Sequence, residues 1–340
     1  MNNTEFHNKE FSQGISTWYL SLGRNGLPWR KNISPYRVWI SEIMLQQTQV
    51  KTVIPFFKKF TKKYPSLKSI ASASEDEILA LWTGLGFYRR AKNIYKTKEI
   101  IKNEFNNKFP KTFEQLLLLP GIGRSTAGAI MSIAYQESYP ILDANVKRVI
   151  SRYKDVDVNN KESIKKLWLL SKDLTPKKNI FEYTQGIMDL GATVCTPKSQ
   201  NCSKCPINIT CKGAFKDFQI ENKVRKDKSK KKIHFTLAHS KESFLLFKKN
   251  ENSFWESLWV PYNKDNREKN NLFNKPEKKE VITIKHLLSH MELEITIEIF
   301  DYKTPFEIKS NLEHQWIDKD QIHNYGLPKP IKTIIDNYVC

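Results

Sequence analysis

Two acidic residues have neighbours that suit them for chemistry. Glu42 is the one acid in Val38–Gln49 (VWISEIMLQQTQ), a segment rich in tryptophan, isoleucine, methionine and leucine. Burial among such residues raises the pKa of a carboxyl and keeps it protonated, as a general acid requires. Asp143 lies in Pro140–Arg148 (PILDANVKR) and could be its ionised partner. A protonated acid paired with an ionised one is typical of glycosidic-bond hydrolysis through an oxocarbenium-like state.

Each acid also has a simpler interpretation. Glu42 could face solvent from the surface of a helix. Asp143 could be an ordinary N-cap of the helix that follows it. The residues around the two acids leave both interpretations open.

Four of the five cysteines are concentrated in one short segment with the spacing C-x6-C-x2-C-x5-C. Thiolates this close together can bind one metal centre, whereas a disulfide framework would spread its cysteines along the chain. The candidates are a tetrahedral zinc ion and an iron–sulfur cluster. The single C-x2-C pair with two wider arms favours the cluster and leaves zinc as the alternative. The four are Cys195, Cys202, Cys205 and Cys211, and Cys340 has no assigned role.

A first glycine-containing loop, Leu119–Ala127 (LPGIGRSTA), is typical of nucleic-acid binding. Pro120 ends one helix, and Gly121 and Gly123 permit a tight hairpin with positive φ angles. The next helix begins near Arg124, and its first amides and positive end suit a DNA phosphate. The loop therefore predicts a helix–hairpin–helix, with an ordinary helix–helix turn as the alternative.

A second loop, Leu81–Arg90 (LWTGLGFYRR), has a glycine pair followed by aromatic residues and arginines. An aromatic side chain at a loop tip can wedge a base step while a cation holds the DNA backbone. Packing of Phe87 or Tyr88 in the core is the competing interpretation.

Helices must position these residues. Ser34 before Pro35 predicts a helix that runs through Gln47. Apolar residues at 127, 130, 131 and 134 follow the stripe of another helix. Two capping boxes are predicted, at Ser74 with Glu77 and at Thr112 with Gln115. Because no strand pattern is found up to residue 212, residues 1–212 are expected to form an all-α domain with a cysteine loop at 195–211.

The composition changes after residue 212. Residues 213–235 contain a run of lysine and arginine without apolar periodicity, which predicts an exposed basic linker. Beyond it, Leu293 to Ile299 alternate apolar and polar residues, which predicts a half-buried antiparallel strand. Ser243–Phe247 and Val281–Ile284 are further strand candidates, and Ile331–Tyr338 is a candidate closing helix. Residues 236–340 are therefore expected to form a small α+β domain.

Composition limits the classes of protein. The chain has 340 residues, enough for about two domains, and 56 basic against 36 acidic residues give a net charge of +20. With 39% hydrophobic and 12% aromatic residues it is not disordered throughout. We find neither a secretory signal nor the run of about 20 apolar residues that spans a bilayer. We expect a soluble intracellular protein with a polyanionic partner, unless the charge only reflects a basic proteome.

These segments together resemble the helix–hairpin–helix DNA glycosylases, and within them the adenine glycosylases of the MutY type. The resemblance covers residues 15–212 and rests on LPWR ending at Arg30, WISEIMLQQTQV around Glu42, LWTGLG, LPGIGRSTAGAI, ILDANVKRV and the four cysteines. It implies a mainly α helix–hairpin–helix glycosylase domain with an iron–sulfur cluster loop, and a small α+β Nudix-like domain. It also implies excision of adenine opposite 8-oxoguanine or guanine, and one 4Fe–4S cluster held by the four cysteines.

The resemblance implies a role for each matched residue. Glu42 would protonate the extruded adenine, Asp143 would stabilise or attack the sugar cation, and Asn145 would orient Asp143 and the sugar. The expected contacts to DNA are Trp29, Arg30 and Asp189 around the adenine, Gln47 and Thr48 beside 8-oxoguanine, Phe87 as the wedge, and Gly121, Gly123, Arg124 and Ser125 at the hairpin. Related glycosylase/lyases carry a Schiff-base lysine where this chain has Ser125. Since a hydroxyl cannot form an imine, the resemblance implies a monofunctional enzyme that uses water.

The chain departs from the family at three places. Phe87 stands where tyrosine is usual, and Ala144 stands where glycine is usual, so a positive φ at Ala144 would be strained. Leu288 replaces an aromatic residue before Ser289 and His290, which match positions at the 8-oxoguanine. The Nudix-like domain has no glycine between Ala214 and Tyr325, so the glycine-containing pyrophosphatase box is absent there. We expect a lesion reader without hydrolase activity.

The implied partner is duplex DNA with A:8-oxoG or A:G mispairs, and we expect a monomeric, cytoplasmic, nucleoid-associated bacterial protein with no membrane partner. Two rival hypotheses remain. One is a glycosylase/lyase for oxidised pyrimidines, close to endonuclease III, against which Ser125 argues. The other is a non-catalytic DNA-binding protein, against which the presence of Glu42 and Asp143 argues.

Overall fold

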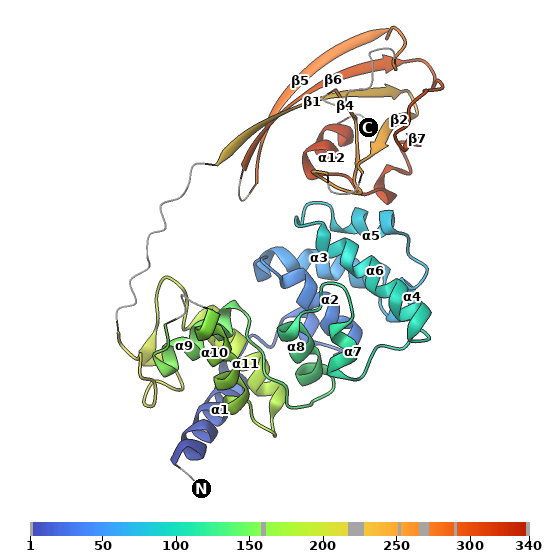
Figure 1. Ribbon diagram of the computed structural model, residues 1–340. Helices are drawn as coiled ribbons and strands as arrows, with labels where there is room; N and C mark the ends of the chain where they lie inside the picture. The colour runs from blue at the N-terminus through green and yellow to red at the C-terminus, as the bar shows by residue number, and fades with distance from the viewer. Residues whose placement is uncertain are drawn as a thin grey trace. The chain divides into compact units, whose positions relative to one another are not determined.

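The computed structural model describes residues 3–157, 161–216, 228–250, 253–264, 272–288 and 291–337 (Figure 1). The chain divides into two compact units, Met1–Ser72 with Lys96–Asn222, and Ala73–Tyr95 with Lys223–Cys340. The predicted fold class is confirmed, because one unit is helical and the other is built around a β-sheet. The boundaries at residues 212 and 236 stay predictions, and the structure adds residues 73–95 to the second unit.

The described residues of the first unit form helices and the loops between them, with an isolated bridge between Cys195 and Gln200. No helix in the described part of the chain combines the length and apolar character that crossing a membrane requires. The elements are α1 (Asn3–Leu22), η1 (Pro28–Arg30), α2 (Pro35–Leu45), α3 (Val50–Lys63), α4 (Leu67–Ile70), the second half of α6 (Arg89–Glu104), α7 (Phe113–Leu117), α8 (Arg124–Ala134), α9 (Ala144–Lys154), α10 (Lys161–Leu174), α11 (Ile180–Thr193) and η2 (Cys202–Lys204).

Side-chain caps start the helices where the sequence predicts them. Ser34 accepts a hydrogen bond from the main-chain N–H of Arg37 at 3.2 Å and caps α2. This helix ends at Leu45, before the predicted end, because Gln47 has a left-handed φ of 55°. The capping box of Ser74 is confirmed at α5 (Glu75–Trp82). Thr112 caps its helix by accepting from the N–H of Gln115 at 3.3 Å, but the full capping box predicted there is not formed.

The predicted helix–hairpin–helix is formed by α7, the turn after it, and α8. Gly121 has a φ of 81°, a conformation that favours glycine. Gly123 does not need this freedom, so the prediction of a positive φ there is wrong. It is the N-cap of α8, with an extended backbone at a φ of −89°.

The described part of the second unit contains a seven-stranded sheet with the order β3-β2-β1-β6-β5, in which β4 also pairs with β1 and β7 with β2. Figure 1 shows α12 lying against this sheet, and its isoleucines belong to the same core cluster as the apolar side of β6. The strands and remaining helices are β1 (Ser229–Ser240), β2 (Ser243–Lys248), β3 (Trp259–Val260), β4 (Tyr262–Asn263), β5 (Lys278–Leu287), β6 (Met291–Tyr302), β7 (His314–Asp318), η3 (Ile322–Asn324) and α12 (Lys329–Asp336), together with α5 and the start of α6.

Two sequence predictions for this unit need correction. β6 is antiparallel only to β5, because its other neighbour is the parallel strand β1, so that Ile295 pairs with both Ile284 and Ile233. The basic segment 213–235 is not all linker, because β1 begins at Ser229 and its lysines pair with β6 through main-chain hydrogen bonds. Main-chain pairing does not depend on side-chain charge, which is why composition missed it.

Candidate active site

A cavity of about 490 Å³ opens into the helical unit. It brings together residues from η1, α2, α9 and α11 and the loops beside them, far apart in the sequence. Six residues predicted to act on DNA line it, namely Trp29, Arg30, Glu42, Thr48, Asp143 and Asn145.

The half-buried side chain of Glu42 lines this cavity from α2. Its position rules out the interpretation as an acid on an open helix surface. Burial is the largest cause that raises the pKa of Glu42, and the Asp143 carboxyl raises it further, against the opposing charge of Arg30. The resulting pKa is about 7. A carboxyl with this pKa holds a proton near neutral pH and can donate it to a bound molecule.

Asp143 is an N-cap that also lies at the wall of the cavity. It is the N-cap of α9, where its Oδ1 accepts a hydrogen bond from the main-chain N–H of Val146 at 2.7 Å, and it lines the same cavity as Glu42. Burial raises its pKa, while hydrogen bonds from the main chain of Val146 and Asn145 and the charge of Arg148 lower it in part. Ala144 is the first residue of α9, so the expected strain is not found.

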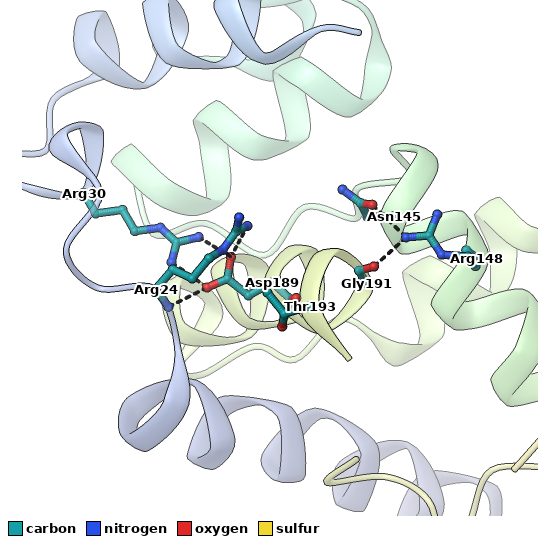
Figure 2. A network of polar contacts seen from close by, with 7 residues as sticks. All are labelled: Arg24, Arg30, Asn145, Arg148, Asp189, Gly191 and Thr193. Carbon is teal, nitrogen blue, oxygen red and sulfur yellow. Dashed lines mark hydrogen bonds and ion pairs between the residues drawn. The ribbon is translucent and has the colours of Figure 1, made fainter. Parts of the chain in front are cut away.

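Arg148 connects Asn145 on α9 with the end of α11 and with the cysteine loop. Figure 2 shows its contacts with Asn145 and Gly191. Its Nη2 donates to Asn145 Oδ1 at 2.8 Å and to the Gly191 carbonyl at 2.5 Å. Its Nε donates to the carbonyl of Cys195 at 2.7 Å. A Cβ on Gly191 would lie 2.7 Å from the Asn145 Cβ, so glycine is needed for the close approach of α9 and α11.

Asp189 is fully buried and binds two arginines (Figure 2). Its carboxylate accepts hydrogen bonds from Arg30 at 2.7 and 2.8 Å, and from the main chain and side chain of Arg24 at 2.5 to 2.8 Å. Burial alone would raise its pKa, but the hydrogen bonds and charges of Arg30 and then Arg24 outweigh burial and lower it. Arg24 and Arg30 line the cavity, and Asp189 lies behind them. Asp189 therefore binds the two arginine side chains and does not itself line the cavity.

The four clustered cysteines line a second, small cavity of about 30 Å³ in the same unit. The Arg152 Nη1 lies 3.3 Å from the Cys195 Sγ, and the Phe215 main-chain N–H donates to the Cys202 Sγ at 3.3 Å. Such donors suit negatively charged sulfur. Within the described ranges, no three His, Cys, Asp or Glu side chains converge closely enough to hold a single metal ion. The four thiols lie around one small cavity, and thiolates so placed can bind either a zinc ion or an iron–sulfur cluster.

The hairpin residues lie outside the 490 Å³ cavity. The Arg124 guanidinium stacks on the Trp168 ring, 4.0 Å from its centroid, at the start of α8. The Ser125 hydroxyl accepts a hydrogen bond from the Leu142 main-chain N–H at 3.0 Å and so connects the hairpin to the segment before Asp143.

Two further predicted residues, Gln47 and Phe87, are not among those that line the cavity. Gln47 is exposed beside it, in a left-handed conformation. Phe87 belongs to the second unit, where 48% of its side chain is exposed, so the interpretation as a core residue is wrong for Phe87. Ser289 and His290 lie outside the described residues, so the structure does not test their predicted role.

Several polar residues that line the cavity were missed by the sequence analysis: Arg24, Ser41, Gln49, Arg148 and Gln185. Arg148 had a signal, because it follows Asn145 by three residues and such residues share a helix face. Arg24 had none, since its partner Asp189 is 165 residues away.

Comparison with known proteins gives two family matches and a full-length relative. Residues 40–177 match the HhH-GPD superfamily of base excision DNA repair proteins, and residues 234–337 match the NUDIX domain. The adenine DNA glycosylase of Buchnera aphidicola subsp. Schizaphis graminum is 41% identical over 96% of this chain and 98% of the relative.

Solved structures resemble one part of the chain. A thermostable thymine-DNA glycosylase matches with a TM-score of 0.57 and 29% identity, over 63% of this chain and 99% of its own. Endonuclease III in a non-covalent complex with DNA matches with a TM-score of 0.53 over 63% of this chain and 97% of its own. At 20% identity, the second match concerns the fold alone.

Proposed function

Because the chain belongs to the adenine DNA glycosylase family, within the HhH-GPD superfamily of base excision DNA repair proteins, we propose that it hydrolyses the N-glycosidic bond of adenine mispaired with 8-oxoguanine or guanine. One observation carries this proposal. Glu42, with a pKa of about 7, and Asp143 line the same cavity. Adenine is a poor leaving group until it is protonated, and the sugar cation left behind needs a negative charge beside it.

Glu42 is the general acid in this proposal. Its apolar helix keeps the carboxyl protonated near neutral pH, so that it can donate a proton to the extruded adenine as the bond breaks. Trp29 and the paired Arg30 form walls on which the base can rest. Gln47, Thr48 and Phe87 are proposed to contact the 8-oxoguanine strand.

Asp143 stabilises the sugar cation, or attacks it to form a transient adduct, before water completes the reaction. Its N-cap bond to Val146 holds the carboxylate at the wall of the cavity. Asn145, held by Arg148, orients the sugar beside it. The hairpin residues Gly121 to Ser125 bind a phosphate and hold the duplex.

We propose that Cys195, Cys202, Cys205 and Cys211 hold one 4Fe–4S cluster. The shared cavity and the N–H groups directed at two of the sulfurs support this assignment. The cluster would cross-link the end of α11 to the loop that follows it. Arg148 connects that loop to Asn145, so the cluster would have a structural effect on the cavity.

The remaining parts of the proposal concern the setting of the enzyme. Ser289 and His290 would read the 8-oxoguanine from a Nudix-like domain without hydrolase activity. The enzyme would act as a monomer on duplex DNA in the bacterial cytoplasm, at the nucleoid.

A panel of duplexes tests this function. Each carries one of four sites, namely A:8-oxoG, A:G, A:T or thymine glycol opposite A, and is treated with alkali after incubation with the protein. We expect strand cleavage at the adenine of the first two and none at A:T. Cleavage of the thymine glycol duplex, with the A:8-oxoG duplex left intact, would instead support the glycosylase/lyase hypothesis. If none of the four duplexes is cleaved, the result would support a DNA-binding protein without catalytic activity.

A further inference from the structure

Residues 73–95 belong to the same compact unit as residues 223–340, although more than a hundred residues separate them in the chain. This segment contains α5, the turn with the exposed Phe87, and the start of α6. The contacts between the segment and residues 248–327 explain this grouping.

The carbonyl of Leu327 is the centre of these contacts. It accepts a hydrogen bond from the Tyr88 hydroxyl at 3.1 Å and another from the Thr83 hydroxyl at 3.1 Å, whose single proton is shared with the Leu79 carbonyl at 3.3 Å. A carbonyl oxygen has two lone pairs, so these two donors saturate it. The Tyr88 hydroxyl in turn accepts from the main-chain N–H of Gly84 at 3.4 Å. The two hydroxyls therefore lie on either side of the Phe87 turn and bind one atom of the sheet unit.

The turn itself has an unusual backbone. Gly84, Gly86 and Phe87 have φ values of 98°, 80° and 50°. Glycine adopts such angles freely, but a bulky residue such as phenylalanine does so only where its surroundings hold it there. The Trp82 Nε1 at 3.0 Å and the Arg90 Nη2 at 3.1 Å both donate to the Gly86 carbonyl. The turn is thus held from inside the segment as well as by Leu327.

Further contacts fix both ends of the segment. Asp76 on α5 accepts hydrogen bonds from the Trp259 Nε1 at 2.9 Å and the Lys248 Nζ at 3.4 Å. Lys92 on α6 forms an ion pair with Glu256. Each of these contacts joins residues 73–95 to the sheet part of the unit.

The chain at Gly326 also packs closely against the apolar side chain of Leu79 on α5. A Cβ on Gly326 would lie 2.4 Å from the Leu79 Cβ and 3.2 Å from a methyl group of Leu258. Glycine is required there, and the carbonyl of the next residue, Leu327, reaches the turn because the chain passes this close to α5.

We propose that the C-terminal part of the chain positions the Phe87 wedge, through the Leu327 carbonyl, with Thr83 and Tyr88 as positioning residues. This inference rests on the proposed function only in taking Phe87 as a side chain that enters the DNA stack. A domain that only reads the base opposite adenine would affect discrimination between 8-oxoguanine and guanine. A domain that positions the wedge affects excision opposite both bases.

The test uses the full-length protein and three variants, Thr83→Val, Tyr88→Phe and the double variant, which remove the hydroxyls and keep the shapes of the side chains. Tyr302→Phe is the matched control, because the Tyr302 hydroxyl also donates to a main-chain carbonyl of this unit, that of Asn274 at 2.7 Å. The probe is 2-aminopurine placed next to the 8-oxoguanine of an A:8-oxoG duplex. Its fluorescence rises when a side chain unstacks it.

We expect wild type and Tyr302→Phe to raise the fluorescence equally. Each hydroxyl variant should lower the amplitude, roughly threefold to tenfold for each hydrogen bond lost, and the double variant most. Single-turnover excision should fall by a similar factor opposite guanine and opposite 8-oxoguanine, while the dissociation constant for the duplex changes less. A merely structural role would lower the melting temperature without moving the fluorescence amplitude of the folded protein.

Two results would overturn the inference. One is a folded double variant with wild-type fluorescence amplitude and wild-type excision, and the other is a wild-type protein that binds the duplex without unstacking the probe. Failure of the proposed function looks different, because a protein that unstacks the probe but never excises adenine leaves the positioning role intact. Should the double variant fail to fold, the two single variants decide by the same readouts.

Discussion

Glu42 and Asp143 line the same cavity, and the Asp143 carboxyl adds to the effect of burial in raising the pKa of Glu42 to about 7. Asp143 is itself held by its N-cap hydrogen bond to the first turn of α9. The two acids thus have different environments, one in an apolar helix and one at the positive end of another helix. Such a difference is what the proposed roles of proton donor and anion require.

The pH dependence of excision follows from this pair. Glu42 must be protonated to act, so the single-turnover rate should fall as the pH rises through about 7, by up to about tenfold per pH unit above it. Asp143 must be ionised, and because its pKa is raised, the rate should also fall at acidic pH. The measurement is the rate of adenine release with enzyme in excess, from pH 5 to 9. A rate that is constant between pH 6 and 9 would contradict the assignment of Glu42.

Asp189→Asn should destabilise the protein. The carboxylate is fully buried between Arg24 and Arg30, and its loss leaves two cations without their anion. Breaking a buried pair in this way costs about 3–5 kcal/mol. Chemical denaturation measures the loss.

The matched control for this change is Asp155→Asn, which removes an exposed pair with Lys216. Asparagine also tolerates the left-handed backbone of residue 155. We expect the control to lose less than about 1 kcal/mol. Equal losses in the two variants would mean that Asp189 contributes no more than a surface ion pair.

Arg148→Lys should lower excision more than DNA binding. Lysine keeps the positive charge but cannot bind Asn145, the Gly191 carbonyl and the Cys195 carbonyl together as the planar guanidinium does. Misplacement of groups beside the reacting bond lowers rates by up to about 10²-fold. Single-turnover excision and duplex affinity are measured side by side. An excision rate within twofold of wild type would show that the network does not orient Asn145.

The cysteine assignment predicts a brown protein. Cys202→Ser should lower the iron and sulfide content, the visible absorption and the melting temperature, because a structural metal centre stabilises the fold that binds it. Cys340→Ser is the matched control and should leave all four unchanged. A colourless wild-type protein with one zinc per chain would contradict the cluster.

The sequence predicted the local features of the site better than the long-range ones. Glu42 and Asp143 could be chosen because apolar neighbours and an N-cap position are visible within a few residues of each. The pairing of Asp189 with Arg24 could not be predicted, since nothing near either residue points to the other across 165 positions.

The same limit applies to the fold. The alternation of apolar and polar residues identified β6 as a strand. It did not predict the parallel pairing of β6 with β1, because pairing depends on two segments at once. Composition likewise gave no sign that residues 73–95 group with the C-terminal sheet. That grouping rests on single contacts such as the hydrogen bond from Trp259 to Asp76. A periodic sequence pattern does not predict a contact of this kind.

The measurement that tests the account most directly compares wild type with Glu42→Gln on an A:8-oxoG duplex, in single turnover and in binding. Glutamine keeps the shape of the side chain but cannot donate the acid proton. We predict that Glu42→Gln binds the duplex as tightly as wild type and excises adenine about 10²–10⁴-fold more slowly. Excision by Glu42→Gln within tenfold of the wild-type rate would contradict the claim that Glu42 is the general acid.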